Sequence, residues 1–158
     1  LSKLLGPGFG IGQAMIEEPA GHASRAFGNA FVPLRVAAPP ALRRSRDESF
    51  HQAILAGDTL YISGQICIEP STGKLKNQDI QEETHQVMHN LRSILTAADM
   101  TFHNVVKTTI FITDMNRFSE INEVYGKYFS DIFPARETVQ VSALPKFVNV
   151  EISMIAVK

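Results

Sequence analysis

Hydrophobic and polar residues alternate along much of the chain with the two-residue period of β-strands. The stretch AILAGDTLYISGQI predicts two short strands around a turn at Gly57 and Asp58. Three later stretches are rich in β-branched residues, which favour extended backbone, and they predict three more strands. These strands span 105–113, about 137–142 and about 148–157.

Two other stretches have the three- and four-residue spacing of amphipathic helices. Apolar residues form one stripe along 79–98 and another along 116–132. Asp79 precedes the first stripe and is expected to cap that helix, because its side chain can accept a hydrogen bond from a free backbone N–H. The order strand–strand–helix–strand–helix–strand–strand predicts an α+β domain, with a single mixed sheet and two helices packed on one face.

Alternation within the strands separates two faces of this sheet. One face is apolar and is expected to be covered by the helices. The other is mixed, and Tyr61, Phe111 and Ile155 make it too apolar for a face open only to water. We therefore expect a closed symmetric oligomer that covers the mixed faces. The apolar set includes Leu60, Ile62, Ile66, Val106, Ile110, Ile112, Val139, Val141, Val150, Ile152 and Met154; the mixed set includes Ser63, Gln65, Lys107, Thr109, Arg136, Thr138, Gln140, Glu151 and Ser153.

The composition fits one globular domain without a strong charge. The chain has 158 residues, of which 44% are hydrophobic and 20% charged, and its formal net charge is −1. Such a charge gives no general attraction to nucleic acid or to an anionic membrane, and no apolar run approaches the about 20 residues of a membrane-spanning helix. The single cysteine, Cys67, excludes an internal disulfide and a cysteine-based metal site.

Residues 1–48 differ from the rest and are predicted to be a leader that precedes a domain at 49–158. No acidic residue occurs from Pro19 to Arg46, and this arginine- and alanine-rich composition is typical of an organelle transit peptide. A disordered tail, a cloning remnant and a mistranslated start are the alternatives. FVPLRV, at 31–36, can add an edge strand, the position to which Pro33 restricts it. We expect a cytoplasmic protein, or a mitochondrial or plastid one if the leader is a transit peptide.

Several residues with potential chemistry are assigned structural roles. His85 and His89 lie four residues apart on the first helix, but no third ligand completes a known metal-site spacing, so a solvated face is expected. The stretches GPGFGIG and SGQ lack the strand–loop–helix context of a nucleotide-binding loop. Cys67 is expected to be buried and inert, and His51 to be non-catalytic.

Four stretches carry a specific resemblance: LYISGQI, VVKTTIFITDMNRFSEINEVYGKYF, FPARETVQVSALPK and VNVEISMIAV. Between about Phe50 and Lys158 they resemble the Rid family of reactive-intermediate imine deaminases, also known as L-PSP endoribonucleases or YjgF-like proteins. The resemblance implies a chorismate-mutase-like fold and a homotrimer. In that trimer three sheets form a central barrel, the helices lie outside, and the active sites lie between subunits.

The resemblance also implies an activity and the residues that perform it. Reactive 2-imino acids and their enamine tautomers, such as 2-iminopropanoate and 2-aminoacrylate, would be hydrolysed to 2-oxo acids and ammonia. The arginine that binds the substrate carboxylate falls on Arg136, and the acid that positions or deprotonates water falls on Glu151. Ser63 and Asn116 are implied to line the pocket. No metal or organic cofactor is implied.

Two candidate substrate-binding positions depart from the family pattern. The family tyrosine corresponds to Phe50, which keeps a ring that can pack against substrate but has no hydroxyl group. Many members have a cysteine two residues after the arginine, where this chain has Thr138. Thiol modification at that position is therefore excluded.

The residues leave other interpretations open. Arg136 or Glu151 could be an ion-pair partner at a subunit interface, Ser63 could satisfy hydrogen bonds of the sheet or a turn, and Asn116 could cap the second helix. Alternative functions are an RNA-acting translation inhibitor or endoribonuclease, and a non-catalytic small-ligand-binding trimer. No basic stripe interleaved with aromatic residues occurs within 50–158, which argues against a nucleic-acid partner.

Overall fold

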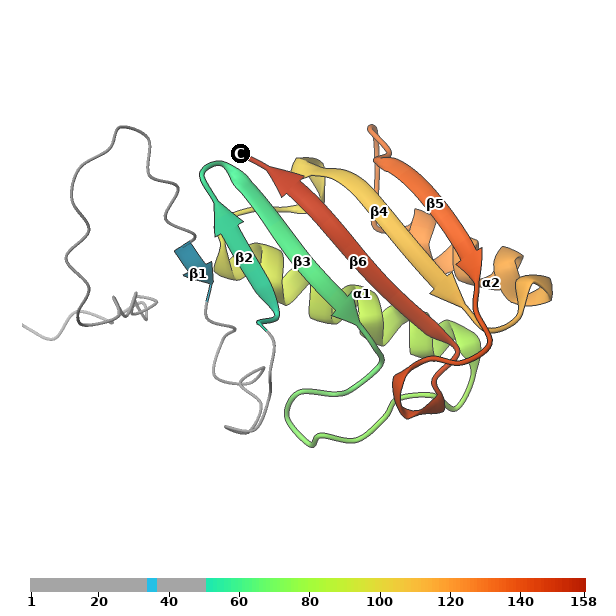
Figure 1. Ribbon diagram of the computed structural model, residues 1–158. Coiled ribbons are helices and arrows are strands. Elements are labelled where there is room, and N and C mark those ends of the chain that lie inside the picture. Colours follow the sequence, from blue (N-terminus) through green and yellow to red (C-terminus); the bar gives the residue numbers. More distant parts are fainter. Residues whose placement is uncertain (1–33, 37–50) are drawn as a thin grey trace, which may run out of the picture.

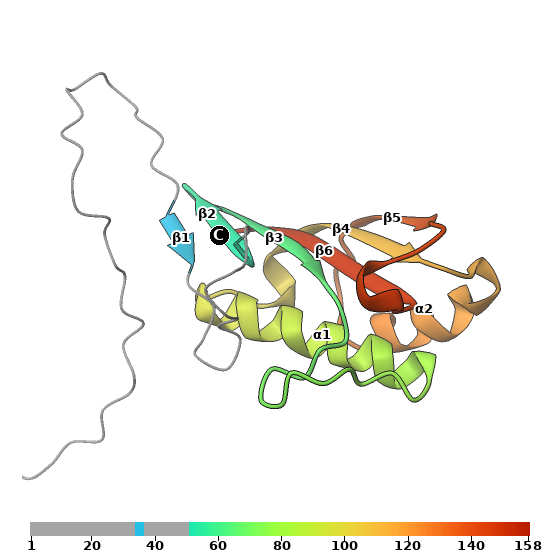
Figure 2. The same ribbon diagram turned by 60° about the horizontal axis from the view of Figure 1, so that its bottom comes forward.

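The computed structural model of the protein describes residues 34–36 and 51–158, which form one sheet with two helices on a single face (Figure 1, Figure 2). This confirms the predicted α+β architecture. The elements are β1 (Leu34–Val36), β2 (Ala53–Ala56), β3 (Thr59–Gln65), α1 (Ile80–Ala97), β4 (Val105–Ile112), α2 (Phe118–Gly126), β5 (Ala135–Gln140) and β6 (Val150–Val157), with short 3₁₀ turns η2 (Phe102–Asn104), η3 (Met115–Arg117) and η4 (Pro145–Phe147).

The sheet has the strand order β1-β2-β3-β6-β4-β5. All neighbouring strands are antiparallel except β4 and β5, which are parallel and are connected through η3 and α2. The last strand in the sequence, β6, therefore lies in the middle of the sheet (Figure 1). β1 pairs with β2 at one edge, which confirms an edge strand within the predicted stretch 31–36.

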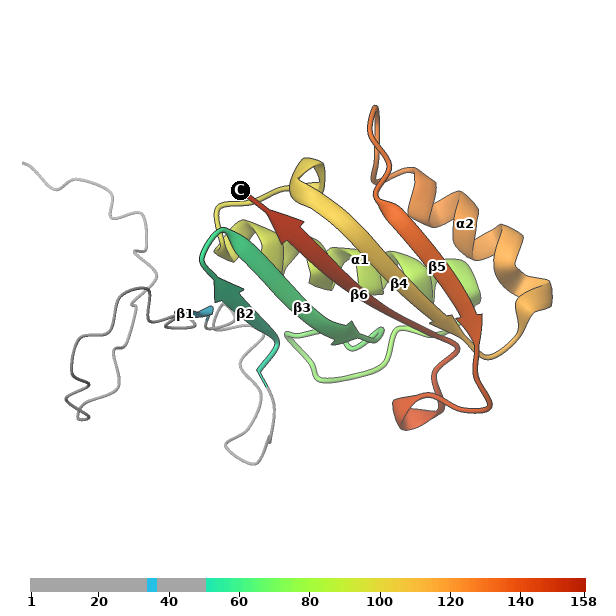
Figure 3. The same ribbon diagram turned by 45° about the horizontal axis from the view of Figure 1, so that its top comes forward.

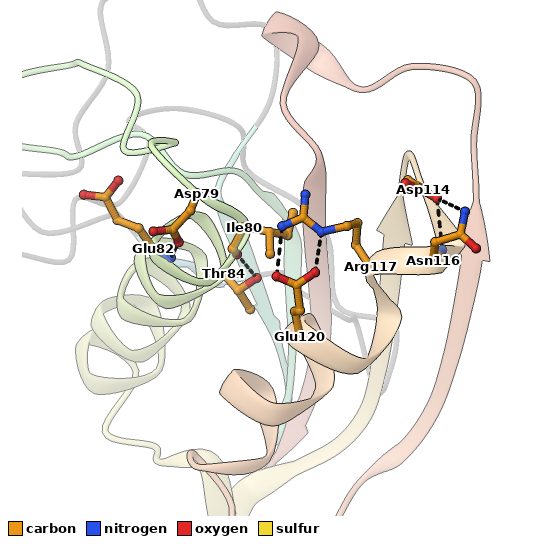
Figure 4. Close-up of polar contacts among 8 residues, drawn as sticks. All are labelled: Asp79, Ile80, Glu82, Thr84, Asp114, Asn116, Arg117 and Glu120. Carbon is orange, nitrogen blue, oxygen red and sulfur yellow. Dashed lines mark hydrogen bonds and ion pairs between the residues drawn. The ribbon is translucent and has the colours of Figure 1, made fainter.

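Helix α1 begins where the sequence predicts. Asp79 is its N-cap, and its side chain accepts a hydrogen bond from the backbone N–H of Glu82 at 2.8 Å (Figure 4). The apolar stripe packs on the sheet and forms a continuous core with the inward side chains of β3, β4 and β6. The fully buried members of that stripe are Val87, Met88, Leu91, Ile94 and Leu95. No helix in the described part of the chain is long and apolar enough to span a membrane.

Two β-bulges change the faces that simple alternation predicts. In β4 the register shifts between Val105 and Lys107, so Val105 is 5% exposed whereas Val106 is 48% exposed. Val105 takes the inner position that alternation gave to Val106, and Thr108 stays on the inner side. In β3 a shift between Ile62 and Gln65 turns Gln65 to the buried side. The predictions for Val106 and Gln65 are therefore wrong, because a bulge inserts one residue and reverses the alternation beyond it.

The edge strand β5 has the opposite orientation to the one predicted. Arg136 pairs with Thr108, on the side of the helices, whereas Val139 pairs with Phe111 on the other face and is 43% exposed. Thr138 and Gln140 share the side of Arg136, since residues two apart in a strand point the same way. The placement of Arg136, Thr138 and Gln140 on the mixed face is thus wrong.

The helix-free face of the sheet is otherwise as predicted. Tyr61 lies beside Ile155, and Phe111 lies beside Glu151, all outside the helix-covered core. Tyr61 is 50% exposed in the single chain. We call this surface the open face.

Candidate functional site

Arg136 is held on the helix side of β5 by one face of α2. Its guanidinium carbon lies 5.6 Å from the ring centroid of Phe118 and 5.1 Å from that of Tyr125. Its Nη1 donates a hydrogen bond to Oδ1 of Asn122 at 2.6 Å. We call Phe118, Asn122 and Tyr125 the arginine cradle. In Figure 3, α2 runs alongside β5, which brings the cradle next to Arg136.

The cradle follows from the helical period. Positions i, i+4 and i+7 lie on one face of an α-helix, which is the spacing of Phe118, Asn122 and Tyr125. Tyr125 is fixed in turn by a hydrogen bond of 3.2 Å from its hydroxyl to Oγ1 of Thr108. Burial raises the pKa of Tyr125, so its hydroxyl keeps the proton that it donates. Tyr125 is therefore held in place by the chain itself, through Thr108 of β4.

The charge of Arg136 is not neutralised within the described part of the chain. No carboxylate there forms a salt bridge with it. The adjacent acid, Glu137, points to the open face, where it accepts hydrogen bonds from Nζ of Lys107 at 3.0 Å and from Oγ1 of Thr109 at 2.8 Å. Arg136 is also exposed, so an anion from outside the chain has access to it.

Glu151 lies on the open face of β6, between the fully buried Val150 and Ile152. Its side chain lies across Gly64 of β3, where a Cβ atom would be 2.7 Å from Cδ and 2.9 Å from Cγ of Glu151. Burial raises the pKa of Glu151. No hydrogen-bond donor among residues 51–158 contacts its carboxyl group, so it can accept a proton or bind water.

The substitution Gly64→Ala is expected to move the Glu151 carboxyl group away from β3. Real Cβ atoms do not tolerate such short contacts, and a glutamate side chain gives way more easily than a backbone. The displaced carboxyl group becomes more exposed to water, and its pKa falls toward the usual glutamate value. An NMR titration of the Glu151 side chain measures this shift.

Gly126→Ala is the matched control for that experiment. Gly126 ends α2, and a Cβ atom there meets nothing within 4 Å. The same methyl group at this position is expected to leave the Glu151 titration unchanged. An unchanged titration in Gly64→Ala as well would show that Gly64 does not determine where the carboxyl group lies.

A buried acid, Glu83 of α1, fixes the start of the strand that carries Glu151. Its side-chain oxygens accept hydrogen bonds from the backbone N–H of Asn149 at 2.6 Å, from Nδ2 of Asn149 at 3.0 Å and from the backbone N–H of Val150 at 2.9 Å. Glu83 is 0% exposed. Sequence analysis missed this residue, for which the one available signal is an acid within the apolar stripe of α1.

The remaining predicted site residues lie apart from one another in the chain fold. Ser63 donates its hydroxyl hydrogen to the carbonyl oxygen of His51 at 2.7 Å, next to Gly64. Thr138 lies on β5, on the same side as Arg136. Phe50 lies outside the described residues.

Asn116 lies on η3, beyond the C-terminal end of β4. Its backbone N–H and its Nδ2 both donate to Oδ1 of Asp114 at 2.9 Å (Figure 4). Asp114 is thus the cap of η3, and the interpretation of Asn116 as a helix N-cap is wrong. Arg117 and Glu120 form an exposed ion pair across the first turn of α2 (Figure 4).

The structure does not bring Arg136 and Glu151 together within one chain. Arg136 contacts α2 on the helix side of the sheet, whereas Glu151 lies on the open face beside Gly64. The expectation that both share the mixed face is therefore wrong. A site that uses both groups needs two copies of the chain.

The contacts and burial of His85, His89 and Cys67 fit structural roles and not a metal or catalytic site. Nδ1 of His85 lies 2.9 Å from the hydroxyl of Tyr128, so His85 is partly buried rather than solvated as predicted, whereas His89 is exposed. The described residues contain no group of three side chains that could hold a metal ion. Cys67 is buried as predicted, and burial with the nearby Glu83 raises the pKa of its thiol to about 11, which keeps it unreactive.

Comparison with known proteins identifies a family whose members are similar to this chain. The model of the family described as Endoribonuclease L-PSP matches residues 43–158. Over 109 residues the chain is 46% identical to the human protein named 2-iminobutanoate/2-iminopropanoate deaminase, covering 69% of this chain and 80% of that protein.

Solved structures agree with this match. A conserved Rid-family protein from Yersinia pestis has a TM-score of 0.72 and 46% identity, covering 77% of this chain and 97% of that one. E. coli TdcF with bound serine has a TM-score of 0.71 and 35% identity, covering 77% and 97%. The resemblance expected from the motifs is confirmed, and the chain belongs to the Rid family, whose matching model is described as Endoribonuclease L-PSP.

Proposed function

We propose that this protein hydrolyses 2-imino acids, such as 2-iminopropanoate and 2-iminobutanoate, to 2-oxo acids and ammonia. The observation that carries the proposal is the exposed guanidinium of Arg136, which the arginine cradle orients and no carboxylate in the described chain neutralises. The 46% identity to a protein named 2-iminobutanoate/2-iminopropanoate deaminase supports the same substrate class.

Arg136 is assigned to the carboxylate of the substrate. A guanidinium group pairs with a carboxylate through two parallel N–H···O bonds, which fixes the orientation as well as the position of the ligand. A hydrogen bond to a charged group contributes about 1.5–3 kcal/mol. The substrate is thereby held with its imine carbon at a defined place, which lowers the entropic part of the barrier.

Glu151 is assigned to the water molecule. The carboxylate accepts a proton from water as the water oxygen attacks the imine carbon, and it passes that proton to the imine nitrogen to give a carbinolamine. The carbinolamine hydroxyl then gives its proton, through the same carboxylate, to the amino group. As the C=O bond forms, the C–N bond breaks, which releases ammonia and leaves the 2-oxo acid. Burial raises the pKa of Glu151 above the usual glutamate value, so activity should fall as the pH drops through that raised pKa.

Two copies of the chain complete this site, in a homotrimer. Arg136 and Glu151 lie on opposite sides of one sheet, so one copy supplies the guanidinium and its neighbour supplies the carboxylate. The half-exposed Tyr61 and the exposed Val139 on the open face support such an interface, since apolar side chains of this size are favoured in subunit contacts.

The other candidate residues complete the pocket from both sides of the sheet. Thr138 follows Arg136 on the same side of β5, and Asn116 belongs to η3, whose Met115 N–H is bonded to Gln140 of β5 at 2.9 Å. Ser63 precedes Gly64, the residue across which the Glu151 side chain lies. Phe50 is proposed to pack its ring against the substrate.

A coupled assay tests the proposal. An amino-acid oxidase or a pyridoxal-phosphate-dependent dehydratase generates the imino acid in the same tube, and ammonia release is followed with and without this protein. We expect faster release, with a loss of activity toward acidic pH that disappears in Glu151→Gln. Unchanged release for every imino acid supplied would refute the proposal, and RNA cleavage in a parallel tube would favour the endoribonuclease alternative.

The division of the chain near residue 48 and the compartment of the protein stay predictions. The proposed domain at 49–158 agrees in extent with the family match over 43–158. The predicted leader lies outside the described residues. A cytoplasmic, mitochondrial or plastid location can be distinguished by imaging the tagged full-length protein.

A further inference from the structure

We propose that Asn122 is a positioning residue that holds the Arg136 guanidinium in place without neutralising it, and so keeps it available to a ligand carboxylate. This inference deepens the proposed function and rests on it for the identity of the ligand class. It adds a role for an α2 residue to which the sequence analysis assigns none.

The contact is specific in geometry. Nη1 of Arg136 donates to Oδ1 of Asn122 at 2.6 Å, and the two aromatic rings of the cradle flank the same guanidinium. Asn122 is exposed, so its amide is not required to fill the core. The one polar partner of Arg136 in the described chain is thus a neutral acceptor on helix α2.

The proposed role of Asn122 depends on the absence of charge on its amide oxygen. An amide oxygen fixes a guanidinium through one hydrogen bond and leaves its positive charge and its remaining N–H groups for another partner. A carboxylate in the same place would form an ion pair and compete with the ligand for the charge. Asparagine and aspartate have nearly the same shape, so a single substitution separates the two effects.

A purely structural role of Asn122 and a positioning role predict different results for the substitution of Asn122 by aspartate. If Asn122 only ties α2 to β5, an acceptor that binds Arg136 more strongly should serve as well as the amide or better. If Asn122 keeps Arg136 available, the variant Asn122→Asp should be as stable as the parent but bind carboxylate ligands poorly. In that case the substitution weakens ligand binding without lowering stability.

The experiment uses the full chain and pyruvate, a 2-oxo acid, as the probe. Pyruvate affinity is measured by titration calorimetry, and the melting temperature is recorded for each variant. In Asn122→Asp the dissociation constant is expected to rise about tenfold or more, the loss of one charge-assisted hydrogen bond, with an unchanged or higher melting temperature. Asn122→Ala should bind about threefold more weakly, because Arg136 is less ordered but keeps its charge.

Asn77→Asp is the matched control. Asn77 is exposed in the loop before α1, and the substitution makes the same change of amide to carboxylate and of net charge. It is expected to leave pyruvate binding unchanged. A dissociation constant for Asn122→Asp equal to that of the parent, or weaker binding in Asn122→Ala than in Asn122→Asp, would overturn the inference, as would a parent protein that binds no pyruvate.

This experiment tests the role of Asn122 separately from the proposed deaminase activity. A parent protein that binds pyruvate but releases no ammonia from imino acids would refute the deaminase. The order of affinities, parent above Asn122→Ala above Asn122→Asp, would still support the role of Asn122. Since Asn122→Asp preserves the side-chain shape, the test does not depend on whether Asn122→Ala folds.

Discussion

Two variants with strongly reduced activity, Arg136→Ala and Glu151→Gln, are expected to regain activity when their chains assemble together. The reason is that Arg136 lies on the helix side of the sheet and Glu151 on the open face, so each site takes one group from each of two copies. In a mixed assembly, some interfaces combine the intact Arg136 of one variant with the intact Glu151 of the other.

The expected size of the recovery is large. Arg136→Ala alone should lower kcat/KM by about 10²-fold or more, because two charge-assisted hydrogen bonds to the substrate carboxylate are lost. When the two variants mix randomly at equal amounts in a closed ring, about one quarter of the interfaces hold both intact groups. Differently tagged chains, co-expressed and purified together, are measured in the coupled ammonia assay.

The control replaces Glu151→Gln by a chain that carries both substitutions. Mixed with Arg136→Ala, that chain supplies no intact Arg136, so no interface recovers. Absence of recovery in the first mixture, although both tags are present in the purified assembly, would contradict a site shared between copies.

Glu83→Ala is expected to destabilise the protein more than any other single substitution considered. The buried side chain accepts hydrogen bonds from Asn149 and Val150, and its removal leaves two backbone donors and one amide donor without a partner. At about 1–3 kcal/mol for each of these three groups, the free energy of unfolding should fall by about 3 kcal/mol or more. Chemical denaturation monitored by circular dichroism measures this loss.

Two control substitutions test whether the loss of stability comes from the hydrogen bonds of Glu83. Glu83→Gln keeps a side-chain oxygen that the backbone N–H groups of Asn149 and Val150 can share, so it should lose much less stability. Gln81→Ala removes an exposed neighbour on the same helix and should change little. Equal losses in Glu83→Ala and Gln81→Ala would mean that the contacts of Glu83 contribute nothing to folding.

The secondary structure could be predicted from local signals because those signals agree with one another. The turn at Gly57 and Asp58, the cap at Asp79 and the apolar stripe of α1 all appear where the pattern places them. β1, at the sheet edge, pairs with β2 just after the proline that confines its stretch to an edge. In each case the sequence carries a residue type whose backbone preference matches the observed element.

The orientation of β5 could not be predicted from alternation. At an edge strand neither side is fully enclosed, so the apolar Val139 does not have to face the core. The deciding contact is instead the arginine cradle on α2, which belongs to another element and attracts Arg136 to its own side. An aromatic stripe on the preceding helix is the signal that could have indicated this.

The candidate site also contains residues that local sequence patterns could not predict. The prediction of Arg136 and Glu151 came from motifs that resemble a family, whereas Asn122 and Glu83 resemble ordinary polar helix residues. Their importance comes from contacts that join distant elements, such as the 2.6 Å bond from the N–H of Asn149 to Glu83 of α1. The face on which a charged side chain lies depends on these contacts as much as on its own strand.

The central position of β6 has a consequence for synthesis on the ribosome. The hairpin of β2 and β3 and the parallel pair of β4 and β5 are joined in the sheet only through β6, which is translated after the other five strands. A nascent chain that still lacks this strand exposes two unpaired strand edges, which are prone to associate with other chains. The sheet is therefore expected to close only after β6 has left the exit tunnel, and chaperone binding should end at that point.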